Sequence, residues 1–189
     1  MSVQLSVGPT ASLPALRLRP WQSDDVHAVV TAYRDAALRR WLTSTVRDDV
    51  EARRWVDTQR QGWADGTRFS FAVVEECGET SGAAVGHVTV KLGDDEGSAE
   101  VGYWTAAEAR GRGLISRSLE TVVQWAFSDE APVPLTRLDL VHAVDNHASC
   151  RVAERCGFEF EAVMPAQPPV FRTDAHLHVR HKSRSLSGA

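Results

Sequence analysis

The segment EARGRGLISRSLE combines residue types that bind anions. The glycines in it are Gly111 and Gly113, and the arginines are Arg110, Arg112 and Arg117. Amides at a helix N-terminus lack intrahelical partners, and the helix dipole favours negative charge there. Glycine lets a phosphate approach the backbone, and arginine donates charge-assisted hydrogen bonds. Two interpretations are open: the loop cradles a phosphate, or the glycines only shape a turn beside solvated arginines.

Two nucleotide-binding motifs do not fit this segment. A P-loop requires GxxxxGK followed by Ser or Thr, and the chain has no such string. The dinucleotide fingerprint GxGxxG begins at Gly111 and Gly113, but Ser116 occupies its third glycine position. The segment also follows antiparallel strands, whereas the fingerprint opens a βαβ unit. The glycines alone therefore identify no ligand.

Hydrophobic periodicity predicts the elements that position this loop. Turn-forming segments separate three β-rich runs ahead of it, which predicts an antiparallel meander. Helix and strand then alternate after the loop. The predicted strands are 15–20, 68–76, 83–92, 98–105, 135–143, 157–164 and 176–182, and the predicted helices are 23–37, 48–64, 111–128 and 146–156.

Length and composition indicate one α+β domain, predicted to span 15–182, with a flexible arm at 1–14 and a disordered tail at 183–189. A chain of 189 residues usually forms a single domain. The net charge of −4 argues against a non-specific nucleic-acid binder. Three cysteines without a CxxC pair favour a reducing compartment, and no run of 18 apolar residues predicts a membrane span. We expect a cytoplasmic protein with no nucleic-acid or membrane partner.

Two separated motifs resemble the GNAT superfamily of N-acetyltransferases. The acyl-CoA motif [QR]xxGx[GA] matches Arg110 and Gly113, with Ile115 in its last position. The pattern NxxSxxxxxxxGF matches Asn146, Ser149 and the Gly-Phe pair that follows. Together with EVGYW, these motifs are most similar to the RimJ/RimL-like branch, which acetylates the N-termini of ribosomal proteins. The resemblance extends over 16–182 and is specific in 100–126 and 144–164.

The resemblance implies a GNAT fold with acetyl-CoA as cosubstrate. That fold has a mixed, mostly antiparallel sheet with helices on both faces, and acyl-CoA binds between two splayed parallel strands, here 98–105 and 136–143. The pantetheine arm would pair with the first strand, and its pyrophosphate would lie on the loop amides. The implied cofactor-binding residues are Val101, Tyr103, Trp104, Arg110, Gly111, Arg112, Gly113, Leu114, Ile115, Ser116 and Asn146. Ile115 departs from the family's Gly or Ala and adds bulk beside the expected pyrophosphate site.

The resemblance also implies two catalytic residues. Glu100 matches the glutamate that acts as a base in this branch, and the alternative is a solvated strand residue near Asp94 and Asp95. Ser149 matches the serine that protonates or stabilises the departing thiolate, and the alternative is a locally satisfied helix residue. Asn146 is also a good N-cap for the helix that begins there. A Cys150–histidine nucleophile with His142 or His147 has no support in the sequence.

The acceptor follows less directly from the sequence. An α-amino group is about one-tenth neutral at pH 7, whereas a lysine amine is neutral in about one molecule in 2,500. A protein N-terminal α-amine attacked in a ternary complex is therefore the leading expectation. A small-molecule amine and a non-catalytic acyl-CoA-binding module remain alternatives, since Ala162 and Pro165 replace a Gly and an Arg of many branch members. Homodimers are common in this branch, so a homodimer is also an open expectation.

Two further groups of residues are expected to be structural. Trp41, Trp55 and Trp63 lie in the first helical region and are expected in the core. His176 and His178 share one face of a strand, a spacing that is compatible with half of a metal site. With no cysteine or carboxylate at ligand spacing, we expect no metal.

Overall fold

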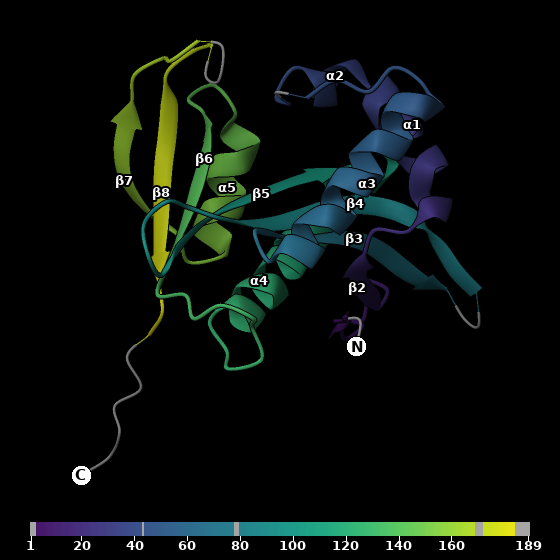
Figure 1. Ribbon diagram of the computed structural model, residues 1–189, viewed down its shortest axis with the longest axis horizontal. Helices are drawn as coiled ribbons and strands as arrows, with labels where there is room; N and C mark the ends of the chain where they lie inside the picture. The colour runs from purple at the N-terminus through teal and green to yellow at the C-terminus, as the bar shows by residue number, and fades with distance from the viewer. Residues whose placement is uncertain (1–2, 43, 78–79, 169–171, 184–189) are drawn as a thin grey trace.

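An eight-stranded sheet organises the chain in the computed structural model, which describes residues 3–42, 44–77, 80–168 and 172–183 (Figure 1). The strand order is β1-β2-β3-β4-β5-β6-β8-β7, and every neighbouring pair is antiparallel except β5 and β6. The strands are β1 Leu5–Val7, β2 Leu16–Pro20, β3 Arg68–Cys77, β4 Thr80–Leu92, β5 Ser98–Thr105, β6 Arg137–Ala143, β7 Glu159–Met164 and β8 Ala175–His181. The α-helices are α1 Val26–Arg34, α2 Ala36–Arg39, α3 Asp49–Asp65, α4 Leu114–Ala126 and α5 His147–Arg155.

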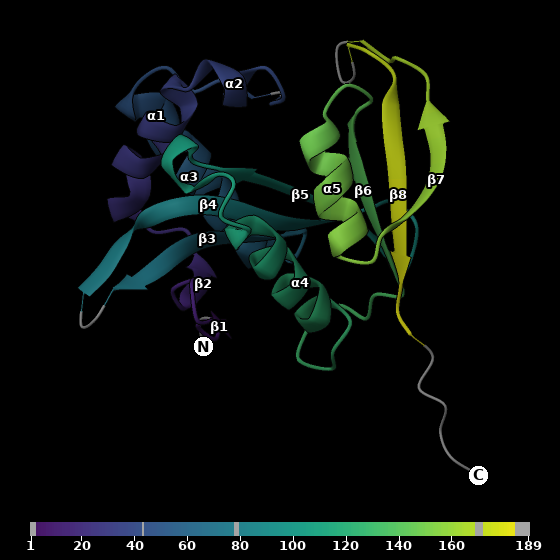
Figure 2. The ribbon, with the colours of Figure 1, turned by 180° about the vertical axis from the view of Figure 1, so that it is seen from behind.

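Helices cover both faces of the sheet, as predicted. Alternation along β3 sends Phe69, Phe71 and Val73 into the cluster formed with α4 and α5. Ala72 and Val74 face the opposite cluster, formed with α1 and α3. Figures 1 and 2 show these helices on opposite sides of the central strands. None of the helices in the described part of the chain is long and apolar enough to cross a membrane.

Two sequence-based expectations need correction. The 1–14 arm is not wholly loose, because Leu5–Val7 pairs with β2 and its apolar side chains pack on the core beside α4. The expected helix at 23–37 is a 3₁₀ turn at Ser23–Asp25 followed by α1, and it ends before Asp35. Asp35 is extended, and its carboxylate accepts a hydrogen bond from the Ala37 amide as the N-cap of α2. The predicted tail lies outside the described residues beyond position 183.

The parallel pair β5–β6 is short. Its register runs only from Ser98 opposite Arg137 to Val101 opposite Leu140. Beyond that point β5 stays paired with β4 as far as Thr105, while β6 stays paired with β8 as far as Ala143. The two halves of the sheet therefore diverge at the carboxyl ends of β5 and β6, as the predicted splay requires.

Helix α4 makes side-chain contacts with the C-terminal half of the sheet. The Arg180 guanidinium of β8 donates to the Glu120 carboxylate of α4 at 2.5 and 3.1 Å. The Cys156 thiol, just after α5, donates to the Ser116 carbonyl in α4 at 3.3 Å. Helix α4 thus connects to the C-terminal half on one face, while the sheet opens at the far ends of β5 and β6.

An aromatic cluster packs against the sheet face that α1 and α3 cover, and it encloses His87 of β4. The Trp21 indole N–H donates to His87 Nδ1 at 3.0 Å, and the imidazole stacks on Trp104 with centroids 5.8 Å apart. Burial, aided by the nearby positive charge of Arg68, lowers the pKa of His87 to about 3. His87 is therefore neutral in the folded protein at physiological pH.

The buried imidazole predicts that the folded state weakens in mild acid. Its pKa is depressed in the folded state, so its stabilising contribution is present above its ordinary pKa of 6.5 and lost as pH falls toward 3. Lowering the pH from 7.5 to 5 should therefore reduce the free energy of unfolding by about 2 kcal/mol through this residue. A His87→Asn variant keeps an acceptor for Trp21 and should lack that loss in urea unfolding at the two pH values. The control is His27→Asn, on the exposed side of α1, which should keep the wild-type dependence of unfolding free energy on pH. If His87→Asn lost as much stability between the two pH values as the wild type does, His87 would not be the residue responsible.

Candidate active site

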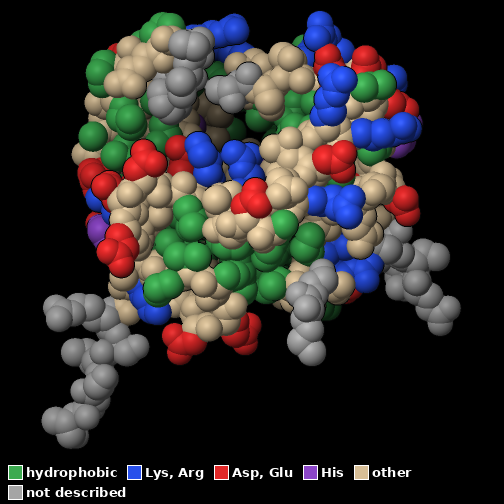
Figure 3. Space-filling model, in the orientation of Figure 1, with side chains coloured by type: hydrophobic (Ala, Val, Ile, Leu, Met, Phe, Trp, Pro, Cys, Tyr) green, Lys and Arg blue, Asp and Glu red, His purple; other side chains and the backbone are tan. Residues whose placement is uncertain are grey.

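A cavity of about 570 Å³ lies where β5 and β6 diverge. Its walls come from β5, the start of α4, the end of β6, the first turns of α5, and the α2 region. The space-filling view shows a hollow between α2 and the half that contains β6 and α5 (Figure 3). An exposed ion pair between Arg40 and Asp145, at 2.7 Å, joins these two walls. The volume lies within the usual range for small-molecule sites.

The loop before α4 forms an open anion cradle. Gly111 and Gly113 have φ of 73° and 72°, which favours glycine, and a Cβ on either would meet nothing within 4 Å. Gly113 is the N-cap of α4 and supplies no side-chain cap, and the first turn carries no acidic residue. The amides of the first turn, from Leu114 to Ser116, are thus available to a phosphate group.

The strand edge beside the cradle offers free backbone groups. Residues 102–105 of β5 face the gap without a partner strand on the β6 side in the described register. A pantetheine arm carries amides that can pair with such an edge. The open cradle and the unpaired edge, both in one cavity, fit acyl-CoA.

Glu100 and Ser149 line the same cavity from opposite faces of the sheet. Along β5, Val101 and Tyr103 pack with the α4 and α5 cluster, whereas Trp104 packs with the α1 and α3 cluster. Glu100 shares the face of Trp104 by alternation, and it is exposed. The cavity therefore passes through the opening in the sheet, with a carboxylate on one side and a hydroxyl on the other.

The structure pairs Ser149 with Tyr103, which the sequence had placed only as a packing and cofactor-binding residue. Burial raises the pKa of Tyr103, and a hydrogen bond with the Ser149 side chain partly opposes that effect. The phenol thus keeps its proton at neutral pH. Its buried hydroxyl makes no hydrogen bond of good geometry within the described residues, so the contact with Ser149 is a loose one. Two hydroxyls are therefore available to a developing anion at this point of the cavity.

Asn146 caps α5, as its position suggested. Its side-chain oxygen accepts a hydrogen bond from the Ser149 amide at 3.3 Å. The same residue lines the cavity. The cap therefore fixes the first turn of α5, on which Ser149 lies.

The loop arginines hold the scaffold in place. Arg110 binds the Asp35 carboxylate and donates to the Thr105 carbonyl at 3.2 Å. The two terminal nitrogens of Arg112 each donate to Glu75 at 2.7 Å. Arg117 donates to backbone carbonyls in the 8–14 segment. Arg110 still lines the cavity, whereas the Arg112 and Arg117 side chains are directed to these partners.

Two arginines that the sequence analysis missed do line the cavity. Arg151 and Arg155 lie on α5, and their i, i+4 spacing places them on one face of that helix. This spacing was the available signal. Both are exposed cations beside the cradle and suit a phosphorylated ligand.

Ile115 does not fill the cradle with its side chain. The side chain packs against the core cluster, and its Cδ1 lies 3.7 Å from the position of a Cβ on Gly86 in β4. The bulk that departs from the family pattern is therefore directed toward the sheet. The Ile115 amide remains in the first turn of α4, beside the cavity.

The three tryptophans separate into two environments. Trp55 and Trp63 pack with the cores as expected, and the Trp63 indole donates to the Ser70 carbonyl at 2.9 Å. Trp41 does not belong to the core, because 36% of it is exposed and it lines the cavity. The Arg40 guanidinium stacks on its ring at 4.5 Å.

Cys150 does lie beside a histidine, which the sequence did not reveal. Its Sγ is 3.5 Å from His176 Nδ1, although no cysteine lies at ligand spacing from the histidines along the sequence. Burial, together with the negative charge of Glu154, raises the pKa of the Cys150 thiol. A protonated thiol is a poor nucleophile, and the geometry gives no support to cysteine catalysis.

The comparisons with known proteins agree with this geometry. Residues 15–159 match the Acetyltransferase (GNAT) domain family. A stretch of 60 residues is 38% identical to "Putative ribosomal N-acetyltransferase YdaF" of Bacillus subtilis (strain 168), covering 32% of this chain and 31% of that protein.

Solved structures share the fold over most of the chain. The Salmonella typhimurium acetyltransferase that modifies the N-terminal serine of ribosomal protein L7/L12 matches with a TM-score of 0.77 and 22% identity, over 96% of this chain and 100% of that one. The microcin C7 self-immunity acetyltransferase MccE, solved with acetyl-CoA and AMP, matches with a TM-score of 0.76 and 16% identity, over 88% and 92% of the two chains. The chain spans about a third of the curated relative YdaF, and it belongs to the GNAT acetyltransferase domain family.

Proposed function

We propose that this enzyme transfers the acetyl group of acetyl-CoA to a protein N-terminal α-amine by direct attack within a ternary complex. The observation that carries the proposal is the cavity through the opened sheet, which receives Glu100 from one face and Ser149 from the other. Donor and acceptor can then enter from different sides and meet at the gap between β5 and β6. A ribosomal-protein acceptor would also agree with the expected cytoplasmic location.

The donor side is built from backbone and from α5. Bound acetyl-CoA supplies an activated thioester, whose acetyl carbon accepts the amine. The amides of residues 114–116 hold the pyrophosphate, with Arg151 and Arg155 alongside. The Ser149 hydroxyl donates a hydrogen bond to the sulfur as negative charge develops on it, and the neutral Tyr103 phenol supports that hydroxyl.

The acceptor side needs only a proton acceptor and a narrow apolar entrance. Glu100 takes the proton that the amine loses on attack, directly or through one water. Leu38, Trp41 and Leu42 line the entrance and suit the side chains of a peptide N-terminus. An α-amine is already about one-tenth neutral at pH 7, so a solvent-exposed carboxylate is a sufficient base.

A small-molecule amine is the second candidate. The Arg40–Asp145 pair joins the two walls of the cavity and narrows its entrance, which favours a compact acceptor. One solved neighbour, MccE, holds AMP together with acetyl-CoA, so the fold accommodates a small second ligand in that protein. A binding module without turnover is the third candidate. The packing of the Ile115 side chain against the core cluster, away from the cradle, weakens the support for it.

Labelled acetyl-CoA distinguishes these candidates. The purified enzyme, acetyl-CoA with a heavy acetyl group and a cell lysate are incubated together, and mass spectrometry then locates the label. We expect it on protein N-terminal residues. Label found only on metabolites would establish the small-molecule alternative, and tight acetyl-CoA binding without any labelled product would establish the binding module.

Ser149→Ala should lower kcat about 10²-fold while leaving the KM for acetyl-CoA within about twofold, because the hydroxyl acts mainly as charge develops on sulfur. Steady-state kinetics of CoA release measures both constants. Ser149→Thr retains the hydroxyl and should recover much of the rate. Unchanged turnover in Ser149→Ala, together with a large loss in Tyr103→Phe, would transfer the donor role to Tyr103.

Glu100→Gln should lower kcat/KM for the amine about 10²-fold at pH 7, with a deficit that narrows toward pH 9. The deficit narrows because most of an α-amine is already neutral at the higher pH. The matched control is Asp139→Asn, since Asp139 stands opposite Glu100 on β6 but pairs with Arg137 at 2.7 Å. The control should stay within about twofold of wild type. If both variants lost kcat/KM equally, Glu100 would contribute only its negative charge near the cavity and would not act as the base.

A further inference from the structure

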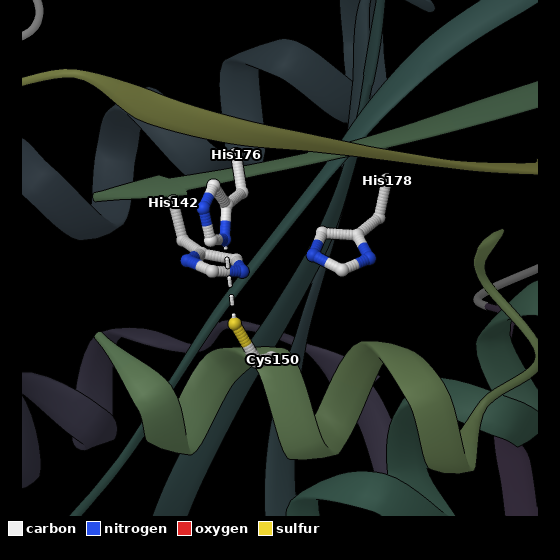
Figure 4. Close-up of side chains that lie close together, drawn as sticks. All are labelled: His142, Cys150, His176 and His178. Carbon is white, nitrogen blue, oxygen red and sulfur yellow. Dashed lines mark hydrogen bonds between the residues drawn. The ribbon is translucent and has the colours of Figure 1, made fainter. Parts of the chain in front are cut away.

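A compact group of nitrogen and sulfur ligands lies beside the active site. His142 of β6 stands opposite His176 of β8 in the antiparallel register, and His178 follows on the same face of β8. Helix α5 packs over that face and contributes Cys150. The four side chains converge between the helix and the two strands (Figure 4).

The four residues are close enough to share one ion. One ligand atom from each can be chosen so that all lie within 4.8 Å of one another. The Cys150 Sγ and His176 Nδ1 are already 3.5 Å apart, and the rings of His142 and His178 have centroids separated by 5.2 Å. A tetrahedral ion with bonds of about 2.0–2.3 Å needs neighbouring ligands roughly 3.3–3.8 Å apart. Small side-chain rotations therefore complete the geometry.

Buried nitrogens in the group have no partner within the described residues. His142 and His178 are only 7% and 3% exposed. His142 Nε2 and both ring nitrogens of His178 make no hydrogen bond of good geometry, although the Phe158 backbone lies near His178. Buried polar atoms are nearly always paired, so these nitrogens indicate a missing ligand.

The orientation of His142 suits metal binding. Its Nδ1 lies 2.9 Å from the Ala143 carbonyl, which only a protonated Nδ1 can satisfy. Nε2 then carries the free lone pair and is directed into the group. A ligand histidine whose second nitrogen donates to a backbone carbonyl is the usual outer arrangement of a metal site.

The charge state is also suitable. Burial lowers the pKa of His142 and of His178, and the neighbouring histidines lower both further. Glu154, one turn along α5 from Cys150, faces the group and supplies negative charge near it.

We propose that His142, Cys150, His176 and His178 bind one Zn²⁺ ion with three nitrogen ligands and one sulfur ligand. Imidazole and thiolate together select Zn²⁺ over the oxygen-preferring Mg²⁺ and Ca²⁺. Four protein ligands make a closed site, which is the structural type and lacks an open position for a reactant. The ion joins β6, β8 and α5, and the Cys150 thiol releases its proton when it binds.

The surroundings protect such a site. The Phe160 ring lies across His176 and His178, with centroids 5.3 and 5.7 Å away. Phe160 is itself 56% exposed, although it is a large apolar residue, so it acts as a cover over the group. An apolar cover limits solvent access and exchange at a metal centre.

Cobalt and zinc binding to the full-length, untagged, chelator-treated chain tests the proposal. We expect one Zn²⁺ per chain by metal analysis. Co²⁺ should give tetrahedral visible bands and a sulfur-to-cobalt charge-transfer band, both abolished by added Zn²⁺. Zinc at a hundredfold excess over its Kd should raise Tm by about 5–10 °C. A wild-type protein that binds no stoichiometric metal, or whose cobalt spectrum lacks the sulfur band, would overturn the proposal without any variant.

Matched variants locate the ligands. Cys150→Ser should abolish the sulfur band, and His176→Asn should weaken Zn²⁺ binding at least about tenfold. The controls are Cys156→Ser, near the end of the same helix, and His147→Asn, which is exposed in its first turn. Both controls should bind zinc as wild type does. If the sulfur band disappeared in Cys156→Ser but not in Cys150→Ser, the sulfur ligand would be Cys156, and the proposed site would be overturned. Melting curves without metal establish that each variant is folded.

Discussion

The parallel pairing of β5 and β6 ends after four residue pairs, and the site depends on that ending. A complete ladder would satisfy the backbone of residues 102–105 and close the sheet. Because β5 pairs with β4 and β6 pairs with β8, each of the two strands keeps its own antiparallel neighbour while the gap opens between them. The gap costs backbone hydrogen bonds that a ligand with amides of its own can replace. Under the proposed function, the bound donor would therefore complete the sheet.

The same opening explains why the loop arginines are occupied elsewhere. A sheet that diverges has little direct contact between its halves, so side chains must brace each wall. Arg110 fixes the α4 loop to the cap of α2, and Arg112 fixes it to Glu75 of β3. Their guanidinium groups hold the cradle in shape, which leaves anion binding to backbone amides and to the arginines of α5. Rigid amides suit this task because they need no side-chain ordering when the ligand arrives.

The sequence predicted what is local and missed what is assembled from distant segments. The glycine loop, the α5 cap at Asn146 and the meander follow from spacing within a few residues. The break at Asp35 was missed because a polar cap residue also fits inside a helical pattern. The partnership of Arg110 with Asp35 joins residues far apart in the chain, and no periodicity encodes it. Cys150 and His176 likewise come from a helix and a strand, so the sequence offered only the two histidines of one strand and not the cysteine that joins them.

Helix α5 connects the two sites. Its first turn carries Asn146 and Ser149 toward the cavity, while Cys150, the next residue, points to the histidines on β6 and β8. His142 contributes to both, since it lines the cavity and belongs to the ligand group. The helix has only nine residues, and short helices rely on tertiary contacts for their stability. An ion held between α5 and the strands would therefore fix the position of the Ser149 hydroxyl, although it would take no part in the transfer itself.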